Sequence, residues 1–191
     1  MTGLLRYATS CLTLAALAVL ALVPRPARAT VVVAKDFAAL CAEADLVFVG
    51  TVTATAAEWS DPEHRAIRTR VTFSDLTWLR GGGETTLTLR FAGGELDGLH
   101  EEVAGVPQFA VGERRVLFAR AGSYVSPLVG FNQGLFQVVD TAAGPVVLDA
   151  EGRAVTGFDR AALRRGAAGD AATALPLAAF LSRVRSEMER R

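Results

Sequence analysis

Hydrophobic and polar residues alternate in short stretches along most of this chain, with glycine-rich turns between the stretches. A period of two residues is typical of β-strands that bury one face, and a short unbroken apolar run is typical of a buried strand. The first such run is Leu46–Val52, where Gly50 indicates a bulge or a close-packing point, and alternation continues from Thr51 to Ala57. The other predicted strands are Arg68–Leu79, Thr85–Phe91, Arg114–Arg120, Leu128–Gly130, Leu135–Asp140 and Val146–Asp149.

The clearest predicted hairpin joins Arg68–Leu79 to Thr85–Phe91. Gly81-Gly82-Gly83 lies between them, and consecutive glycines tolerate the positive φ angles that tight turns require. Simple alternation along the first strand places alternate residues on opposite faces. One face should carry Val71, Phe73, Asp75 and Thr77, and the other Thr72, Ser74, Leu76 and Trp78.

Two helices are predicted, one near each end of the chain. Asp36 can cap a short helix over Phe37–Ala44, because its carboxylate can accept from the free amides of the first turn. Asp159 can cap a helical turn through Arg164, with a small-residue linker at Gly166–Gly169. A second helix starts at Pro176 and carries one apolar stripe, formed by Leu177, Phe180, Leu181, Val184 and Met188.

The apolar stripe of the C-terminal helix has two interpretations. It can dock the helix on the sheet, which is the interpretation we favour. Alternatively, the stripe and the neighbouring basic residues can bind a partner or a membrane surface. The basic residues are Arg183, Arg185, Arg190 and Arg191.

The first 29 residues have the order of a secretory signal peptide. Arg6 precedes the apolar run Leu12–Val23, and Ala27-Arg28-Ala29 supplies small residues before a cleavage site between Ala29 and Thr30. The run is shorter than the roughly 20 residues of a membrane-spanning helix. An uncleaved membrane anchor is the alternative. Export predicts a secreted or periplasmic protein.

Cleavage changes the composition of the chain. The precursor has 20 basic and 20 acidic residues, but Arg6, Arg25 and Arg28 lie in the signal, so the mature chain has a net charge of −3. Only Cys41 remains of the two cysteines, so no internal disulfide is expected. The 51% hydrophobic content excludes a disordered chain, and the charge balance argues against nucleic-acid binding.

These patterns predict a mainly β protein, a β-barrel or a sandwich, with a short N-terminal helix and a C-terminal amphipathic helix. The expected divisions are a signal peptide at 1–29, a β domain at 30–158 and a C-terminal helical segment at 159–191. Residues 92–109 are rich in glycine and are expected to form an extended loop. Loops of this length often have a function.

Few residues in the sequence indicate catalysis. His64 and His100 lie in predicted loops, each beside acidic residues, but they are 36 positions apart and neither has a second histidine nearby. Solvated loop histidines are the simplest interpretation, and a metal site built from both loops is the alternative. No serine lies in a G-x-S-x-G motif. Cys41 on an apolar helix face indicates a buried thiol.

No cofactor-binding motif is present either. The glycine pairs and triplets occur without the G-x-x-x-x-G-K-[ST] sequence of a phosphate-binding loop, and none leads from a strand into a helix. We therefore expect no cofactor, no metal and no catalytic residues.

Several short stretches resemble netrin-like domains, the OB-barrel family that includes tissue inhibitors of metalloproteinases. They are Cys41–Val52 (CAEADLVFVGTV), the hairpin Thr69–Phe91 with its Leu79-Arg80-Gly81 turn entry, and Phe109–Arg114 (FAVGER). Residues 93–138, with VPQFAVGERRVLF and VGFNQGLFQVV, also resemble uncharacterised bacterial secreted proteins. The resemblance covers about 46–138 and implies that the β domain at 30–158 is an OB-like β-barrel, with the short N-terminal helix and the C-terminal amphipathic helix beside it.

The inhibitory chemistry of that family is not implied. Those inhibitors bind zinc through an N-terminal cysteine with a free amine, whereas this mature chain is expected to begin Thr30-Val31-Val32. These three residues are candidates for partner contact. We expect a non-enzymatic binding module whose partner is an extracellular or periplasmic protein such as a protease.

Two alternative functions remain at this point. The first is a secreted hydrolase that uses His64 or His100 with nearby acids. The second is association with a membrane, which is expected only through an uncleaved signal or through the C-terminal helix.

Overall fold

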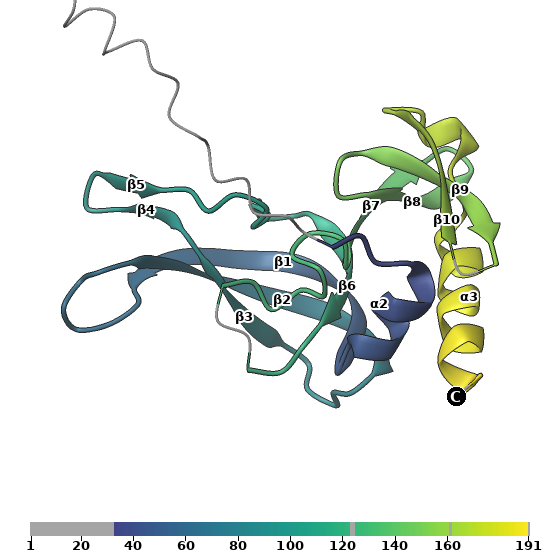
Figure 1. The fold of residues 1–191 in the computed structure, drawn as a ribbon. Helices are drawn as coiled ribbons and strands as arrows, with labels where there is room; N and C mark the ends of the chain where they lie inside the picture. The colour runs from purple at the N-terminus through teal and green to yellow at the C-terminus, as the bar shows by residue number, and fades with distance from the viewer. Residues whose placement is uncertain (1–32, 123–124, 161, 191) are drawn as a thin grey trace, which may run out of the picture. The chain divides into compact units, whose positions relative to one another are not determined.

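The computed structural model describes residues 33–122, 125–160 and 162–190 (Figure 1). The predicted signal peptide, the cleavage site at Ala29 and Thr30, and the partner-contact candidates Thr30, Val31 and Val32 lie outside these residues. The first elements are α2 (Phe37–Glu43), β1 (Leu46–Trp59), β2 (Ile67–Arg80), β3 (Leu87–Ala92), β4 (Gly94–Leu96) and β5 (Leu99–Glu101). The remaining elements are β6 (Arg114–Ala119), β7 (Leu135–Thr141), β8 (Gly144–Asp149), β9 (Arg153–Asp159), β10 (Ala162–Ala168), the 3₁₀ turn η1 (Ala171–Thr173) and α3 (Leu177–Glu189).

The protein is mainly β, with one helix before the sheet and one after it, as predicted. Eight strands form an antiparallel sheet in the order β10-β9-β8-β7-β6-β1-β2-β3, and β4 and β5 form a separate hairpin. Among the described residues, the edge strands β3 and β10 do not pair with each other. The sheet is therefore not closed into a barrel.

Helix α2 begins where the sequence predicts. The Asp36 carboxylate accepts a hydrogen bond from the Ala39 amide at 2.7 Å, which satisfies one of the free N–H groups of the first turn. Phe37, Leu40 and Cys41 are buried. The buried position of Cys41 on the apolar face of this helix was also predicted.

The first part of strand β1, up to Val52, is largely buried on both faces because it lies between two hydrophobic clusters. Val47 and Val49 belong to the first cluster, with Phe118 of β6 and residues of both helices. Phe48 and Val52 point to the second cluster, with Phe73 and Phe91. Side chains of successive strand residues point to opposite faces, which explains why the strand begins with the unbroken apolar run Leu46–Val49.

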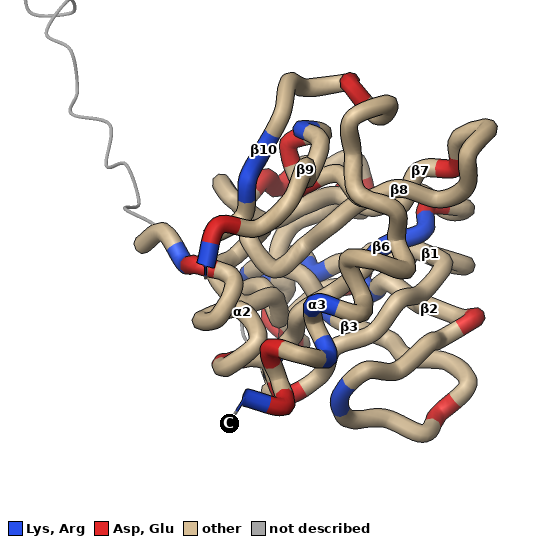
Figure 2. The backbone as a smooth tube through the Cα atoms, turned by 90° about the vertical axis from the view of Figure 1, so that its right-hand side faces the viewer, with Lys and Arg blue, Asp and Glu red and all other residues tan. Residues whose placement is uncertain are grey.

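Helix α3 packs on the first cluster through its apolar stripe. Leu177, Phe180, Leu181 and Val184 are buried, and Met188 packs against the same cluster. Arg183, at the edge of the stripe, lies over the Phe158 ring at 5.4 Å and donates to the Arg160 carbonyl at 2.9 Å. Figure 2 marks basic residues on α3 and on β10. The prediction of a docked helix is confirmed.

Strand β2 departs from simple alternation at Asp75. This residue has a φ of 52°, and the pairing with β1 shifts between Val49 opposite Thr77 and Thr51 opposite Ser74. The extra residue is a β-bulge, which reverses the faces beyond it. Leu76 and Trp78 therefore pack on the same cluster as Phe73, and the predicted alternation is wrong after Ser74.

Gly50 lies in β1 beside this bulge. A Cβ atom at Gly50 would be 2.8 Å from Leu76 Cδ2 and 3.2 Å from Phe73 Cβ. The predicted close-packing point is confirmed, because a Cβ atom here would press on Leu76 and Phe73.

Two other predicted elements are wrong. The segment Leu128–Gly130 is not a strand: it contacts β6 through a single bridge between Ala119 and Leu128, and Gly130 has a φ of 65° that turns the chain away. The expected helical turn from Asp159 through Arg164 and the linker at Gly166–Gly169 are replaced largely by β10, which pairs with the unpredicted strand β9.

Tertiary contacts stabilise the hairpin of β9 and β10. Arg160 has a φ of 51°, the left-handed conformation that allows a tight turn. Asp149, only 3% exposed, accepts from Arg153 Nε and Arg165 Nε, each at 2.9 Å. The bond with Asp149 raises the pKa of Arg153. Asp149 thus links the end of β8 to β9 and β10.

Candidate functional site

The long segment 92–109 is not a simple loop, because it contains the hairpin of β4 and β5. Glu95 lies opposite His100, and Leu96 opposite Leu99. The turn residues Asp97 and Gly98 have φ angles of 52° and 77°. An Asp-Gly pair with positive φ at both positions is typical of a two-residue hairpin turn. This dipeptide was the signal in the sequence that could have predicted the hairpin.

Three hydrogen bonds hold the base of this hairpin against the start of β2. The Gly93 amide donates to the Ile67 carbonyl at 2.8 Å, and the Thr69 hydroxyl donates to the Gly93 carbonyl at 2.7 Å. The Ile67 amide donates to the Glu101 carboxylate at 2.7 Å. Gly93 has a φ of 91°, and a Cβ there would lie 2.7 Å from the Glu101 carbonyl oxygen. The chain can therefore leave the sheet at this point only through glycine.

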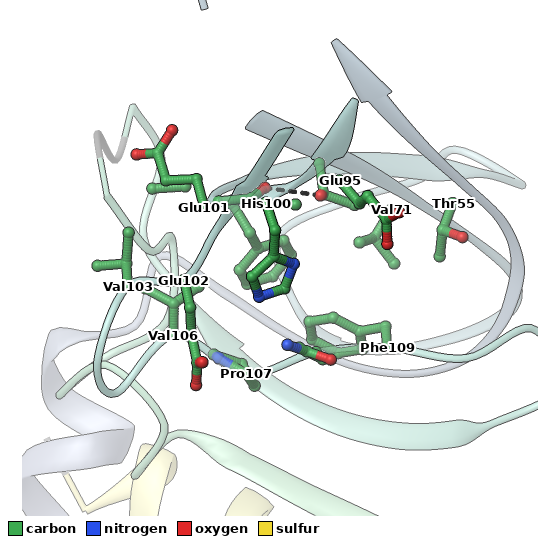
Figure 3. A pocket seen from close by; sticks show the side chains of 16 residues that line it. Thr55, Val71, Glu95, His100, Glu101, Glu102, Val103, Val106, Pro107 and Phe109 are labelled. Carbon is green, nitrogen blue, oxygen red and sulfur yellow. Dashed lines mark hydrogen bonds between the residues drawn. The ribbon is translucent and has the colours of Figure 1, made fainter. Parts of the chain in front are cut away.

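A pocket of about 210 Å³ lies between this hairpin, strands β2 and β3, and the segment 102–109 (Figure 3). We call it the hairpin pocket. Its lining includes apolar groups from β2, β3 and the segment 103–109, and polar groups from β4, β5 and Glu102. The lining residues are Thr55, Thr69, Val71, Phe91, Ala92, Gly93, Gly94, Glu95, His100, Glu101, Glu102, Val103, Val106, Pro107, Gln108 and Phe109.

The apolar part of the pocket continues into the second hydrophobic cluster. Val71 and Phe91 are buried, and the Phe109 ring packs on Phe91 with the ring centroids 4.7 Å apart and on Phe73 at 5.7 Å. The polar residues Glu95, His100 and Glu102 are exposed. In Figure 3 the His100 imidazole projects over the pocket. The site therefore has a fixed apolar floor and an accessible, acidic rim.

The two histidines occupy different places. His64 lies in the turn after β1, where its ring stacks on Trp59 with centroids 4.6 Å apart and an interplanar angle of 11°. His64 does not line the hairpin pocket, whereas His100 does. The two loops are nevertheless linked, since Trp59 Nε1 donates to the Asp97 carboxylate at 3.3 Å.

Asp61 organises the turn that carries His64. Its carboxylate accepts from the Ser60 hydroxyl at 2.8 Å, and from the Arg65 amide and Arg65 Nε at 3.3 and 3.4 Å. The bond from Ser60 is the main cause that lowers the pKa of Asp61 to about 2, with the Arg65 contacts adding to the shift and desolvation opposing it. This carboxylate has a structural role in the turn and does not line the pocket.

The pocket has only part of what catalysis needs. His100 is opposite Glu95, a pair that could move a proton, but no serine or cysteine is among the lining residues. The hydroxyl of Thr69 is engaged with the Gly93 carbonyl, and Cys41 is buried in the first cluster. Among the described residues, no three His, Cys, Asp or Glu side chains are grouped closely enough to hold a metal ion.

Other cavities are more polar and belong to structural ion pairs. One of about 300 Å³ is lined by Arg115, which is 8% exposed and pairs with Glu113 at 2.7 Å. Another of about 220 Å³ is lined by Asp149 and its partners Arg153 and Arg165. Of these three cavities, the hairpin pocket is the one that combines an apolar floor with acidic residues that have no ion-pair partner in the described part of the chain.

Comparison with known proteins gives no relative. No family model, curated protein or solved structure matches this chain. In the described part of the chain, neither helix combines the length and the apolar character needed to cross a membrane. What the site can do must therefore be argued from its geometry.

Proposed function

We propose that this protein is an exported, non-enzymatic binding module that holds a segment of a partner protein in the hairpin pocket. The observation that supports this function best is the pocket itself: an apolar floor under an exposed polar rim, on a hairpin held to the sheet by hydrogen bonds at its base. An extracellular or periplasmic protein such as a protease is the partner class we propose. No cofactor takes part in this function.

The size of the pocket favours part of a protein over a larger free ligand. Typical small-molecule pockets have volumes of about 300–1,000 Å³. The hairpin pocket has about 210 Å³ and accommodates roughly one or two side chains. Binding also agrees with the absence of a serine or cysteine nucleophile among the lining residues, which makes the hydrolase alternative with His100 the weaker proposal.

We also propose that the fold follows an OB-like plan related to netrin-like domains. The order of α2, β1, β2 and β3 at the positions of the sequence resemblance supports this, as does the second hydrophobic cluster enclosed by β1, β2, β3 and β6. The barrel would be open in this plan. An experimental structure with no curvature of β1 and β2 around that cluster would contradict the proposal.

Export is tested by sequencing the N-terminus of the protein recovered from periplasm and culture fluid. Cleavage at the predicted site gives a chain that begins at Thr30. A chain that retains Met1 and stays with the membrane fraction would contradict export by a cleaved signal. It would support the uncleaved anchor instead.

The binding function is tested by site-specific photo-crosslinking in cells. A photoreactive amino acid at Gln108, which is exposed and lines the pocket, should give an adduct with a partner protein. The matched control places the same group at Glu84, which is exposed in the turn between β2 and β3 and does not line the pocket.

An adduct from Gln108 and none from Glu84 supports the proposal. Adducts of equal yield from both positions indicate non-specific contact and contradict it, and so does the absence of any adduct from Gln108. The hydrolase alternative is tested by substituting both His64 and His100. It predicts that a measured hydrolytic activity is lost in this variant.

A further inference from the structure

We infer that the hairpin pocket selects a basic side chain, lysine or arginine, in the segment that it binds. This inference rests on the proposed binding function and adds the chemical class of the bound residue. It follows from three observations: the apolar floor of the pocket, the negative charge of its rim and the position of two neighbouring arginines on the other face of the sheet.

The floor can hold the aliphatic part of a long side chain. Val71 and Phe91 are buried under the pocket, and the Phe109 ring lies beside Phe91. Lysine and arginine bury their methylene groups along apolar surfaces while the charged end stays near water.

The rim is negative and is not neutralised by the protein itself. Glu95, Glu101 and Glu102 line the pocket, and no lysine or arginine does. None of these three carboxylates belongs to an ion pair within the described residues. Glu101 accepts from the Ile67 amide, so Glu95 and Glu102 are the two acids open to a ligand.

Two arginines of the neighbouring strands lie on the other face of the sheet. Arg70 and Arg90 are paired across β2 and β3, next in sequence to Val71 and Phe91, whose side chains point to the pocket. Both arginines contact Glu58, at 2.9 and 3.1 Å. Because these two arginines form ion pairs with Glu58 on that face, they do not neutralise the negative charge of the pocket rim.

A bare metal ion does not fit these observations as well as a basic side chain. Among the described residues, no group of three metal-ligating side chains is close enough to hold an ion. An apolar floor also contributes nothing to metal binding, whereas it stabilises the stem of a lysine or arginine.

The test uses four blocked tripeptides, acetyl-Leu-Xaa-Leu-amide with Xaa as Lys, Arg, Gln or Glu, added at millimolar concentration to the mature protein. Binding is followed by amide chemical shifts in NMR spectra. We expect the Lys and Arg peptides to shift the signals of residues 92–109 and to bind about fivefold more tightly than the Gln peptide. The preference should weaken as salt is added.

Matched variants test whether the preference for a basic peptide depends on the acids of the pocket rim. Glu95→Gln combined with Glu102→Gln should abolish the preference for Lys over Gln. The control, Glu84→Gln combined with Glu189→Gln, removes the same charge from exposed positions outside the pocket and should keep it. NMR spectra of each variant also report whether it is folded.

Equal binding of the Lys and Gln peptides, tighter binding of the Glu peptide, or no shift in residues 92–109 with any peptide would overturn the inference. Crosslinking at Gln108 distinguishes a failure of this inference from a failure of the proposed binding function. If Gln108 still gives a crosslinked partner while the charge preference is absent, the pocket binds a segment of another chemistry. If crosslinking also fails, the binding function itself is wrong.

Discussion

At the scale of single residues, hydrogen bonds to the Asp61 carboxylate fix the conformation of the turn that carries His64. Asp61 accepts from Ser60 and Arg65, and these bonds order the turn where His64 stacks on Trp59. In the sequence, the acids near His64 are compatible with a catalytic role as well as with a structural one. In the structure Asp61 stabilises the turn, because its carboxylate oxygens accept hydrogen bonds from Ser60 and Arg65 of the same turn.

We predict that Ser60→Ala raises the pKa of Asp61 from about 2 toward its ordinary value, because the largest cause of the shift is removed. The measurement is an NMR titration of the Asp61 carboxyl carbon. Ser74→Ala, which removes a hydroxyl from β2, is the control and should leave the titration unchanged. An unaltered midpoint in Ser60→Ala would show that the hydroxyl does not stabilise the carboxylate.

The same shift predicts a pH dependence of stability. A carboxylate with a lowered pKa in the folded state stabilises the fold at pH values above about 4, the ordinary pKa range of Asp, and this contribution is lost as pH falls toward about 2. In Ser60→Ala the loss over this pH range should be smaller than in the wild type. Urea unfolding at a series of pH values measures it. An identical dependence in both proteins would contradict the linkage.

At the scale of elements, the β-bulge at Asp75 redirects half of a strand. Without it, Leu76 and Trp78 would face away from Phe73. With it, both pack on the second hydrophobic cluster, and Trp78 contacts Phe48 with ring centroids 5.1 Å apart. The conformation at Asp75, with a φ of 52°, is tolerated by Asp and is unfavourable for β-branched residues.

We predict that Asp75→Val lowers the free energy of unfolding by about 1–2 kcal/mol, because valine at this φ is strained. Thr77→Val makes a comparable change at an exposed position of the same strand and should alter stability by less than about 0.5 kcal/mol. Urea unfolding followed by Trp fluorescence measures both. If Asp75→Val is neutral, the strand continues without a bulge and Trp78 faces outward.

At the scale of the whole described chain, the two helices and the far strands of the sheet share one hydrophobic cluster. Phe180 of α3 is fully buried and packs against one phenylalanine ring from each of three other elements. The distances from its ring centroid are 4.9 Å to Phe136 of β7, 5.9 Å to Phe37 of α2 and 6.0 Å to Phe158 of β9. Segments from both ends of the chain therefore depend on one another for stability.

We predict that Phe180→Ala lowers the free energy of unfolding by about 3–5 kcal/mol, through lost burial and the cavity left behind. Arg185→Ala, on the exposed side of the same helix, should change it by less than about 0.5 kcal/mol. Thermal and urea unfolding give both values. A small effect of Phe180→Ala would mean that α3 is not required for the folded core.

Features whose cause lies within a few residues could be predicted from the sequence alone. The Asp36 cap and the apolar stripe of α3 were predicted, because capping and periodicity act locally. The antiparallel pairing of β2 with β3 was predicted too, but it ends at Phe73 and Leu87, so the connection is longer than the tight turn expected at Gly81–Gly83. The Asp97-Gly98 turn belongs to the same class, although the prediction of a plain loop missed it.

Tertiary structure alone decided the rest. Strand β10, ALRRGAA, has no apolar alternation, and it becomes a strand because β9 and Asp149 lie beside it. The hairpin pocket joins Val71, Phe91, Glu95, His100 and Phe109 from separate segments, so neither its apolar floor nor its unpaired acids could be read from spacing. Long-range packing and charge compensation arise between residues far apart in the chain, and only the folded arrangement specifies them.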